Sequence, residues 1–357
     1  MTAATTTGAM RAVRIWDRGN GPEAVYETDV PIPQAGPGEV LIRVQACGVN
    51  QVDLLTLAGA TPRPVQYPHT SGTEVAGDIA AVGEGVADWA VGDRVVVDPV
   101  MTCGVCEYCI TGRNNLCIRG EIYGVLTQGG YAEYAVAPAK QLLRVPDNLD
   151  YSEAAALAVT APTAWHMLHR RAGLRAGEDV LVIAAGSGIG VIAVQIAKLS
   201  GARVIATAGG PDKVAKALEL GADYAIDHNQ PDWSKQVREI TDRRGVDVVF
   251  EHVGKATWDQ SIASMARSGR LVTSGGHGGF DVDINLWQLF IKELVLIGSY
   301  AGTRQDFIDV MRLAEKGEIR PVIHATLPLG RAAEAQAMLR DRAAFGKILL
   351  NPTEVTA

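Results

Sequence analysis

The pattern of apolar residues between positions 180 and 208 predicts a strand, a helix and a second strand. Residues 180–185 form an apolar and largely β-branched run, which is typical of a buried strand. Apolar residues then recur at helical spacing over 191–199, Gly201 ends that helix, and residues 203–208 predict the next strand. A glycine-rich turn separates the first strand from the helix. The segment therefore predicts a strand–helix–strand unit of a parallel sheet.

The glycine-rich turn has the composition that binds the pyrophosphate of a dinucleotide. Glycines allow the backbone to approach a pyrophosphate closely, and the N-terminus of the helix presents unpaired N–H groups and the positive end of its dipole. The placement of the turn between a strand and a helix makes this interpretation specific. We therefore expect the turn residues to bind the cofactor: Gly186, Ser187, Gly188, Ile189 and Gly190.

The end of the second strand indicates which dinucleotide is bound. A carboxylate there would bond the ribose 2′-hydroxyl of NAD and repel the 2′-phosphate of NADP. Residues 203–210 contain no carboxylate. Thr207 and Gly209 leave room for a phosphate, and Lys213, with Arg203 as a weaker candidate, could supply positive charge. We expect NADPH rather than NADH, although Lys213 could instead be a solvated residue of the next helix.

The remaining pattern divides the chain into two regions. Residues 10–100 alternate short strands with turns that contain Gly and Pro, and residues 129–145 predict more strand. Beyond residue 213, helices and strands alternate, as in a doubly wound parallel sheet. The final strand, 347–350, has no place in that sheet and is expected to return to the first domain. Residues 1–9 are small and polar, and we expect them to be disordered.

Composition narrows the possible partners. A chain of 357 residues is long enough for two domains, and its 47% hydrophobic and 20% charged residues are ordinary for a globular enzyme. The net charge of −7 argues against nucleic acid or an anionic membrane as a partner. The sequence has neither an 18-residue apolar run nor a signal peptide pattern. We therefore expect a cytoplasmic protein that acts on a small molecule.

Four of the five cysteines lie within fifteen residues: Cys103, Cys106, Cys109 and Cys117. Gaps of two residues let thiolates converge on one ion, and four sulfur ligands suit tetrahedral Zn²⁺. The close spacing and the expected cytoplasmic setting disfavour disulfides, and an iron–sulfur cluster is the alternative. Because protein would fill all four positions, we expect a structural zinc. The fifth cysteine, Cys47, is expected to be a core thiol.

These features together resemble the medium-chain dehydrogenase/reductase superfamily, which includes zinc alcohol dehydrogenases and quinone oxidoreductases. The resemblance covers about residues 10–351, and its motifs are the four-cysteine segment, the glycine turn, CGVNQVD (47–53), SGTEVAG (71–77), LGAD (220–223) and FGKILL (345–350). It implies an α/β fold with a GroES-like β domain, 10–157 completed by 300–357, and a doubly wound Rossmann domain, 158–299. It also implies a homodimer that forms through an edge strand at 295–299, or a homotetramer.

The chain departs from the zinc alcohol dehydrogenases at the catalytic metal. The ligand positions of that family correspond here to Asn50, Thr73 and the neighbourhood of Val159, and none of these side chains can form a tight Zn²⁺ site. Asp53 and Glu74 remain, but the resemblance places them behind the metal rather than on it. The resemblance therefore implies a member that has the structural zinc and lacks the catalytic one.

The loss of that metal changes the expected chemistry. Without a Lewis acid, alcohol oxidation loses its main means of stabilising an alkoxide. Hydride transfer from NADPH to an activated C=C bond remains possible, because neutral donors can support the oxygen of the resulting enolate. The resemblance thus implies an NADPH-dependent reductase of enones, quinones or enoyl thioesters. Two alternatives stay open, namely an alcohol or aldehyde dehydrogenase with a metal bound in another way, and a non-catalytic NADPH-binding protein.

The resemblance also implies roles for individual residues. Asn50 and Thr73 would face the nicotinamide and donate hydrogen bonds to a carbonyl oxygen, and Thr163 would lie beside the nicotinamide. Asn50 could instead be a loop residue that satisfies its own backbone. His277, in a run of glycines, is a candidate proton donor, with water as the alternative.

Lys347 lies in the FGKILL segment near the end of the sequence. The resemblance places it among the cofactor-binding residues. Asp53 could pair with it, and such a pair would join the two ends of the β domain.

Overall fold

The structure is a computed structural model that describes residues 8–16, 24–61 and 63–354. The chain divides into two compact units. One unit comprises the chain up to Val159, Thr303–Glu315 and the segment from Ile323 onward, and the other comprises Thr160–Gly302 and Lys316–Val322. The domain boundaries expected from the sequence lie two or three residues from these, and residues 316–322 fall in the second unit rather than the first.

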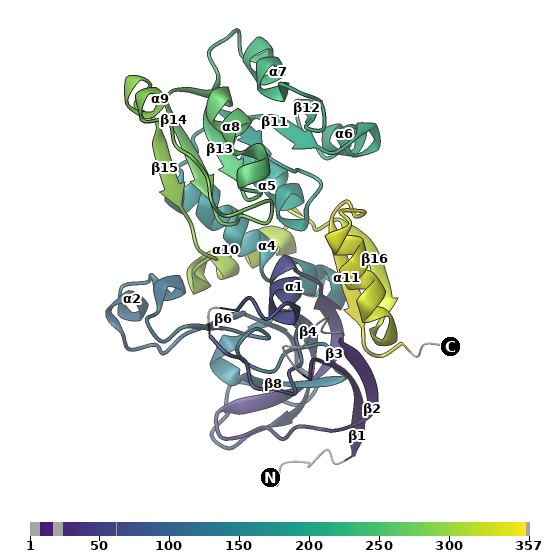
Figure 1. Ribbon diagram of the computed structural model, residues 1–357. Coiled ribbons are helices and arrows are strands. Elements are labelled where there is room, and N and C mark those ends of the chain that lie inside the picture. Colours follow the sequence, from purple (N-terminus) through teal and green to yellow (C-terminus); the bar gives the residue numbers. More distant parts are fainter. Residues whose placement is uncertain (1–7, 17–23, 62, 355–357) are drawn as a thin grey trace. The chain divides into compact units, whose positions relative to one another are not determined.

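The second unit is built on a six-stranded parallel sheet of order β12-β11-β10-β13-β14-β15 (Figure 1). Its strands are β10 (Asp179–Val182), β11 (Arg203–Ala208), β12 (Tyr224–Asp227), β13 (Val246–Glu251), β14 (Met265–Thr273) and β15 (Val295–Gly298). Its helices are α4 (Thr160–Trp165), the π-helix His166–Arg171, α5 (Gly188–Leu199), α6 (Pro211–Glu219), α7 (Trp233–Ile240), α8 (Lys255–Ser264) and α9 (Leu286–Ile291). The strand order reverses between β10 and β13, where doubly wound sheets bind their ligands. The predicted doubly wound fold is confirmed.

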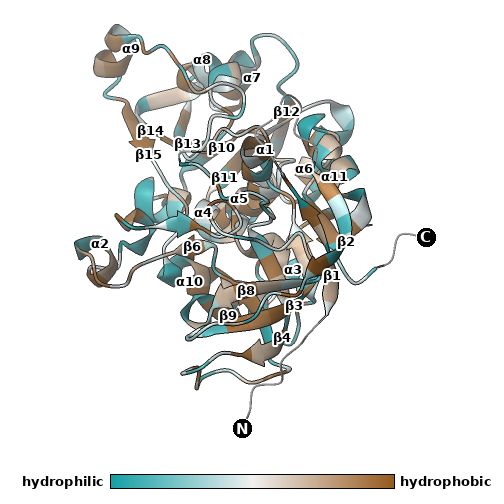
Figure 2. Cartoon of the chain, turned by 60° about the horizontal axis from the view of Figure 1, so that its bottom comes forward, coloured by the Kyte–Doolittle hydropathy of each residue, from teal (hydrophilic) through white to brown (hydrophobic). Residues whose placement is uncertain are grey.

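The interior of this sheet and its β15 edge differ in how far their apolar side chains are buried. The interior strands are buried by an apolar cluster that includes Leu181, Ile205 and Val249. At the β15 edge, by contrast, both β15 and the neighbouring helix α9 are coloured as hydrophobic in Figure 2. Several of their apolar residues are exposed, namely Leu286, Trp287, Phe290, Ile291 and Val295.

The first unit is built on a sheet of order β16-β17-β3-β4-β5-β9, with β8 also pairing with β3. These strands are β3 (Glu39–Gly48), β4 (Glu74–Val82), β5 (Arg94–Val97), β8 (Tyr134–Pro138), β9 (Leu142–Arg144), β16 (Ile323–Pro328) and β17 (Lys347–Asn351). The other strands and helices are β1 (Ala9–Arg14), β2 (Val25–Pro31), β6 (Val100–Met101), β7 (Glu121–Ile122), α1 (Gln51–Leu57), α2 (Glu107–Ile110), α3 (Tyr151–Leu157), α10 (Arg304–Glu315) and α11 (Ala332–Arg340). The final strand β17 pairs antiparallel with β3, so its expected return to the first domain is confirmed.

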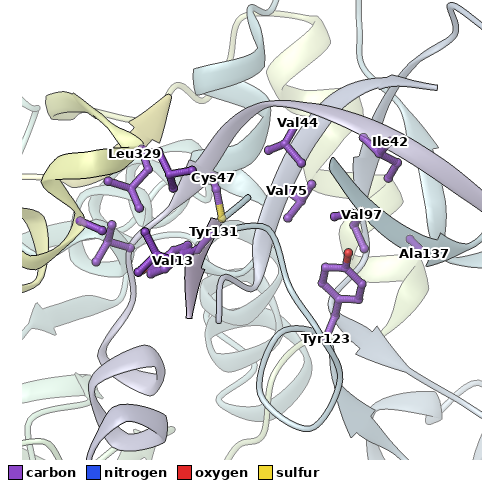
Figure 3. Packing of buried hydrophobic residues seen from close by; sticks show 14 of the residues in the cluster. Val13, Ile42, Val44, Cys47, Val75, Val97, Tyr123, Tyr131, Ala137 and Leu329 are labelled. Carbon is purple, nitrogen blue, oxygen red and sulfur yellow. The ribbon is translucent and has the colours of Figure 1, made fainter. Parts of the chain in front are cut away.

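The core of the first unit lies against this sheet (Figure 3). Alternating apolar residues of β3, among them Ile42 and Val44, pack with residues of β4, β5 and β8. Cys47 is a fully buried free thiol within this cluster, as the sequence predicts.

The N-terminal prediction needs one correction. Residues 1–7 lie outside the described residues, but Gly8 and Ala9 are ordered against β2 rather than disordered. The carbonyl oxygen of Gly8 accepts a hydrogen bond of 3.1 Å from the backbone N–H of Ile32, and Ala9 pairs with Pro31. Small and polar side chains do not prevent strand pairing, because the ladder uses backbone groups alone. Among the described helices, none combines the length and apolarity that crossing a bilayer requires.

Candidate active site and metal centre

The glycine turn follows β10 and begins α5 as the sequence pattern suggests. Ser187 is the N-cap of α5, and its Oγ accepts a hydrogen bond of 2.9 Å from the backbone N–H of Gly190. A Cβ on Gly190 would lie 2.4 Å from the carbonyl oxygen of Ala184, so only glycine allows the helix to pack this closely on the strand. The turn therefore has the local geometry of a dinucleotide-binding turn.

A buried histidine, His252, supports this turn; the sequence places it with His277 at a strand end near the cofactor, with His277 as the better candidate proton donor. His252 follows β13, and its Nε2 lies 3.0 Å from the carbonyl oxygen of Ile183 and 3.3 Å from Ser187 Oγ. Burial lowers the pKa of His252 to about 4, so the ring is neutral at neutral pH. Because the Ile183 carbonyl can only accept, Nε2 carries the ring proton. The only sequence signal is its place at the end of a predicted strand.

The end of β11 shows how the candidate 2′-phosphate residues are placed. Thr207 is fully buried, and its Oγ1 accepts a hydrogen bond of 3.1 Å from the backbone N–H of Ala184, so it supports the glycine turn from behind. Gly209 and Gly210 follow it, and the Asp227 carboxylate accepts a hydrogen bond of 2.9 Å from Gly210 N–H. Lys213 lies in the first turn of α6, where burial and the neighbouring Lys216 lower its pKa.

The other predicted residues of the second unit lie apart from this turn in sequence. Thr163 is buried within α4. His277 has an exposed side chain in the loop that follows β14, and its charge opposes protonation of His252. Asn50, Thr73 and Lys347, by contrast, belong to the first unit.

The structure brings Asn50, Thr73 and Lys347 together in one hydrogen-bonded network, which we call the Asn50 network. The Lys347 ammonium donates to Asn50 Oδ1 at 2.8 Å and to the carbonyl oxygen of Val49 at 3.2 Å, and it forms an ion pair of 2.6 Å with Glu74 Oε2. Asn50 Nδ2 donates to Thr73 Oγ1 at 3.1 Å. Thr73 and Glu74 are fully buried and Lys347 is 4% exposed, whereas Asn50 is partly exposed. Asn50 is therefore the solvent-facing end of the network.

The expected pair of Asp53 with Lys347 is wrong, because Lys347 pairs with Glu74. The cause is strand register: Gly48 of β3 stands opposite both Glu74 of β4 and Leu349 of β17, which puts Lys347 on the same side as Glu74. A Cβ on Gly48 would lie 1.9 Å from Glu74 Oε2, so glycine is required for the carboxylate to cross β3. The β domain is joined at its two ends, as expected, but by Glu74.

Asp53 is instead held by its own helix and by a tyrosine. Its Oδ2 accepts hydrogen bonds from Asn50 N–H at 2.8 Å and from Tyr131 Oη at 3.0 Å, while Oδ1 is buried without a hydrogen bond. Burial raises the pKa of Asp53 to about 6, with the hydrogen bonds and Lys347 opposing that rise. Burial also raises the pKa of Glu74, and Lys347 again opposes the rise.

The four clustered cysteines converge in space. Their sulfur atoms lie within 4.8 Å of one another, with Cys106–Cys109 at 3.5 Å, and Cys103–Cys109 and Cys106–Cys117 at 3.9 Å. Four thiolates placed 2.3 Å from a tetrahedral Zn²⁺ would be about 3.8 Å apart. The set therefore fits zinc. Among the described residues, no other three or more His, Cys, Asp or Glu side chains converge in this way.

Comparisons with known proteins match both units. The family model "Alcohol dehydrogenase GroES-like domain" matches residues 36–147, and "Zinc-binding dehydrogenase" matches residues 188–316. An acryloyl-coenzyme A reductase of Sulfurisphaera tokodaii is 34% identical over 93% of this chain and 98% of its own. A quinone oxidoreductase of Rattus norvegicus is 31% identical over 97% and 99%. A crystal structure of an NAD-dependent alcohol dehydrogenase has a TM-score of 0.91 at 41% identity, covering 96% of this chain and 99% of that one.

The chain belongs to the medium-chain dehydrogenase/reductase superfamily. It is an NAD(P)H-dependent oxidoreductase of this type. Its GroES-like and Rossmann folds, predicted from sequence motifs, are confirmed by the family models and the sheet topology.

For this medium-chain dehydrogenase/reductase we predict one zinc per chain. The segment that carries the four clustered cysteines, 103–117, is called the cysteine lobe. It would bind that ion, and the Asn50–Thr73 position would bind none. Elemental analysis of protein purified without chelator measures the ratio. Cys106→Ser/Cys109→Ser should lose the zinc, whereas Cys47→Ala, which alters a thiol outside the lobe, should keep it. Two zinc ions per chain would contradict this account of the Asn50 network.

The buried Asp53 carboxyl predicts a pH-dependent stability effect. A carboxyl whose pKa rises on folding favours the folded state below its unfolded pKa and loses that contribution as the pH rises through the folded value. With a folded pKa of about 6 against an ordinary 3.8, ionised Asp53 costs up to about 3 kcal/mol at pH 8 and about 1 kcal/mol at pH 4.5. Asp53→Asn should therefore raise the free energy of unfolding more at pH 8 than at pH 4.5.

Urea unfolding at the two pH values tests this prediction. The exposed Asp88 provides a control, because Asp88→Asn should change the free energy of unfolding by less than about 0.5 kcal/mol at both. An Asp53→Asn effect that is equal at pH 8 and pH 4.5 would show that this carboxyl does not carry a raised pKa.

Proposed function

We propose that this enzyme transfers hydride from NADPH to a C=C bond conjugated with a carbonyl group, without a metal at the reaction centre. The observation that carries the proposal is the Asn50 network. At the positions that the family resemblance assigns to ligands of a catalytic zinc, the Asn50 amide donates a hydrogen bond to the Thr73 hydroxyl, and the Lys347 ammonium donates one to Asn50. Enones, quinones and enoyl thioesters all have the required conjugated oxygen.

The printed names of two relatives favour this reaction class. One relative is an acryloyl-coenzyme A reductase and another a quinone oxidoreductase, and each is matched over nearly its whole length. The similarity to an NAD-dependent alcohol dehydrogenase favours a second candidate, oxidation of an alcohol with a bound metal. The two candidates differ in their response to metal removal, since C=C reduction through Asn50 would persist in the presence of chelator.

In this reaction the protein's part is to stabilise the negative charge that develops on the carbonyl oxygen of the substrate. When bound, NADPH supplies the hydride that adds to the carbon β to the carbonyl. The electron pair of the C=C bond then shifts so that the carbonyl oxygen becomes an enolate oxygen. The partly exposed Asn50 amide would donate a hydrogen bond to that oxygen, with Thr73 holding the amide from behind. The α-carbon is then protonated, and we keep His277 and water as the two candidate donors.

The cysteine lobe is proposed to hold a structural Zn²⁺ alone. All four tetrahedral positions are taken by Cys103, Cys106, Cys109 and Cys117, which leaves no open position for a substrate. Thiolates must remain reduced to bind the metal, so we propose a cytoplasmic location.

Replacing Asn50 tests the proposed role in catalysis. Asn50→Ala should lower kcat on an enone about 10- to 100-fold, because it removes the donor to the developing oxyanion. The Kd of NADPH should change less than about twofold, since Asn50 belongs to the other unit from the glycine turn. Steady-state kinetics with and without chelator and a fluorescence titration of NADPH measure these quantities.

A matched asparagine controls for general damage. Asn148 donates a hydrogen bond of 3.1 Å to the carbonyl oxygen of Ala314 in the same unit, and Asn148→Ala should leave kcat unchanged. Undiminished enone turnover by Asn50→Ala would remove this residue from the mechanism. Turnover lost on addition of chelator would favour the alcohol dehydrogenase candidate.

The preference for NADPH rests on the end of β11. The strand and turn at 203–210 provide no carboxylate for a ribose hydroxyl, and Lys213 lies one turn into α6. Because a hydrogen bond to a charged group contributes about 1.5–3 kcal/mol, Lys213→Ala should raise the KM of NADPH about tenfold or more and leave that of NADH unchanged. Lys216→Ala, on the same helix, is the control and should change neither. Equal losses with both cofactors would show that Lys213 does not read the 2′-phosphate.

We also propose that the enzyme is a homodimer, or a homotetramer built from such dimers, through the β15 edge. Among the strands that the structure describes, β15 pairs with β14 alone, so its other side is an edge. The exposed Leu286, Trp287, Phe290 and Val295 lie on β15 and on the neighbouring α9. A second copy offers the same edge and the same apolar side chains, and two such edges can pair about a twofold axis.

Light scattering after gel filtration tests this proposal. The native protein should have two or four times the chain mass of 37.8 kDa, and Trp287→Asp/Phe290→Asp should lower it to a smaller species. Val91→Asp, at an exposed apolar residue of the other unit, should leave the mass unchanged. A monomeric native protein would contradict the proposal.

A further inference from the structure

Lys347 is the cation of the Asn50 network, and it is almost fully enclosed. Its Nζ contacts three oxygens, of Glu74, Asn50 and Val49, at 2.6, 2.8 and 3.2 Å. Two of these contacts are hydrogen bonds, to Asn50 and Val49, and the third is the ion pair with the Glu74 carboxylate. Lys347, which is 4% exposed, is therefore the ammonium of a buried ion pair.

The ammonium also fixes which way the Asn50 amide points. Because an ammonium can only donate, the atom of Asn50 that faces it must be the carbonyl oxygen Oδ1. Nδ2 then faces Thr73 Oγ1 at 3.1 Å, and this bond uses one of its two N–H groups. The Asn50 side chain also donates a hydrogen bond to the Glu74 carboxylate, so its second N–H lies toward Glu74. Because Oδ1 is turned to the ammonium, the group that the partly exposed Asn50 can offer a ligand is its NH₂, and not its carbonyl oxygen.

We propose that Lys347 is a positioning residue that orients and polarises the Asn50 amide. Its buried ammonium then stabilises the substrate oxygen indirectly, because the Asn50 amide lies between them. This inference rests on the proposed C=C reduction and deepens it. Positive charge at Oδ1 draws electron density from the amide nitrogen, which makes the Asn50 NH₂ a stronger donor. A fixed charge in a buried site requires no reorganisation when the oxyanion develops.

Glu74 and Asp53 are the charged groups that face this ammonium, and the Cys47 thiol lies near it. Glu74 is fully buried and forms the ion pair, so it compensates the cost of burying Lys347. Removing Lys347 alone would leave Glu74 as an unpaired buried charge and would destabilise the fold. A test of the Lys347 role must therefore change both residues together.

The test is a double-mutant cycle between the ion pair and Asn50. Lys347→Met/Glu74→Gln removes both charges at similar side-chain size, and it should lower kcat on an enone about 10- to 100-fold with the KM of the enone changed less than about threefold. In an Asn50→Ala background, the same pair should lower kcat less than about threefold further, because its effect passes through Asn50. Equal losses in both backgrounds would overturn the proposal and leave a structural role.

A second variant separates charge from orientation. Lys347→Gln/Glu74→Gln keeps a hydrogen-bond donor for Asn50 Oδ1 but removes the charge. The Asn50 amide should then keep part of its orientation and lose its polarisation. The kcat of this variant should lie between those of the native enzyme and the Met variant. Thermal melting shows which variants fold. Should the Met variant not fold, the Gln variant completes the cycle with the same criterion of non-additivity.

A measurement without substrate distinguishes failure of this inference from failure of the proposed reaction. If the native enzyme reduces no enone, quinone or enoyl thioester, the proposed function fails whatever Lys347 does. In protein labelled with [¹⁵N]asparagine, the Asn50 side-chain NH₂ signals are identified by their absence from Asn50→Ala. They should shift in Lys347→Met/Glu74→Gln, and unchanged signals would show that Lys347 does not polarise this amide.

Discussion

The buried ion pair of Lys347 with Glu74 is the interaction on which the candidate active site depends. It joins β17 to β4 across β3, so it holds together segments from the two ends of the sequence. Pairs of this kind contribute little net stability relative to apolar residues, but loss of one partner costs about 3–5 kcal/mol because the other charge stays buried. The pair therefore acts mainly by specifying which side chains meet at Asn50, and Gly48 is the residue that gives the Glu74 carboxylate its path.

The two candidate sites of the first unit, the cysteine lobe and the Asn50 network, have different chemistry. The cysteine lobe gathers four sulfur atoms at distances that suit a tetrahedral ion, in a segment whose apolar side chains are exposed, among them Val105, Ile110 and Ile118. A metal bound there would take the place of a core. The Asn50 network contains no such ligand set, and it arranges donors instead. The convergence of the four cysteines is a property of local spacing, whereas the donor network is a property of the assembled sheet.

This difference explains what the sequence could and could not predict. The glycine turn and the four cysteines are contiguous, so spacing alone predicted their convergence and their local geometry. The partner of Lys347 depends on the register of three strands that are far apart in the sequence, and the expected Asp53 pair was wrong for that reason. The strand-end position of His252 was predicted, but its hydrogen bonds were not, because they depend on where β13 ends relative to β10, which no local pattern records.

The catalytic assignment depends on where hydride goes, and a single labelling experiment measures it. The enzyme would be supplied with NADPH that carries deuterium at the transferred position and with an α,β-unsaturated ketone, and the product analysed by NMR. This account predicts deuterium on the carbon β to an intact carbonyl, because the Asn50 amide supports an enolate oxygen. Deuterium on a carbinol carbon, with the C=C bond retained, would show carbonyl reduction and would contradict the account.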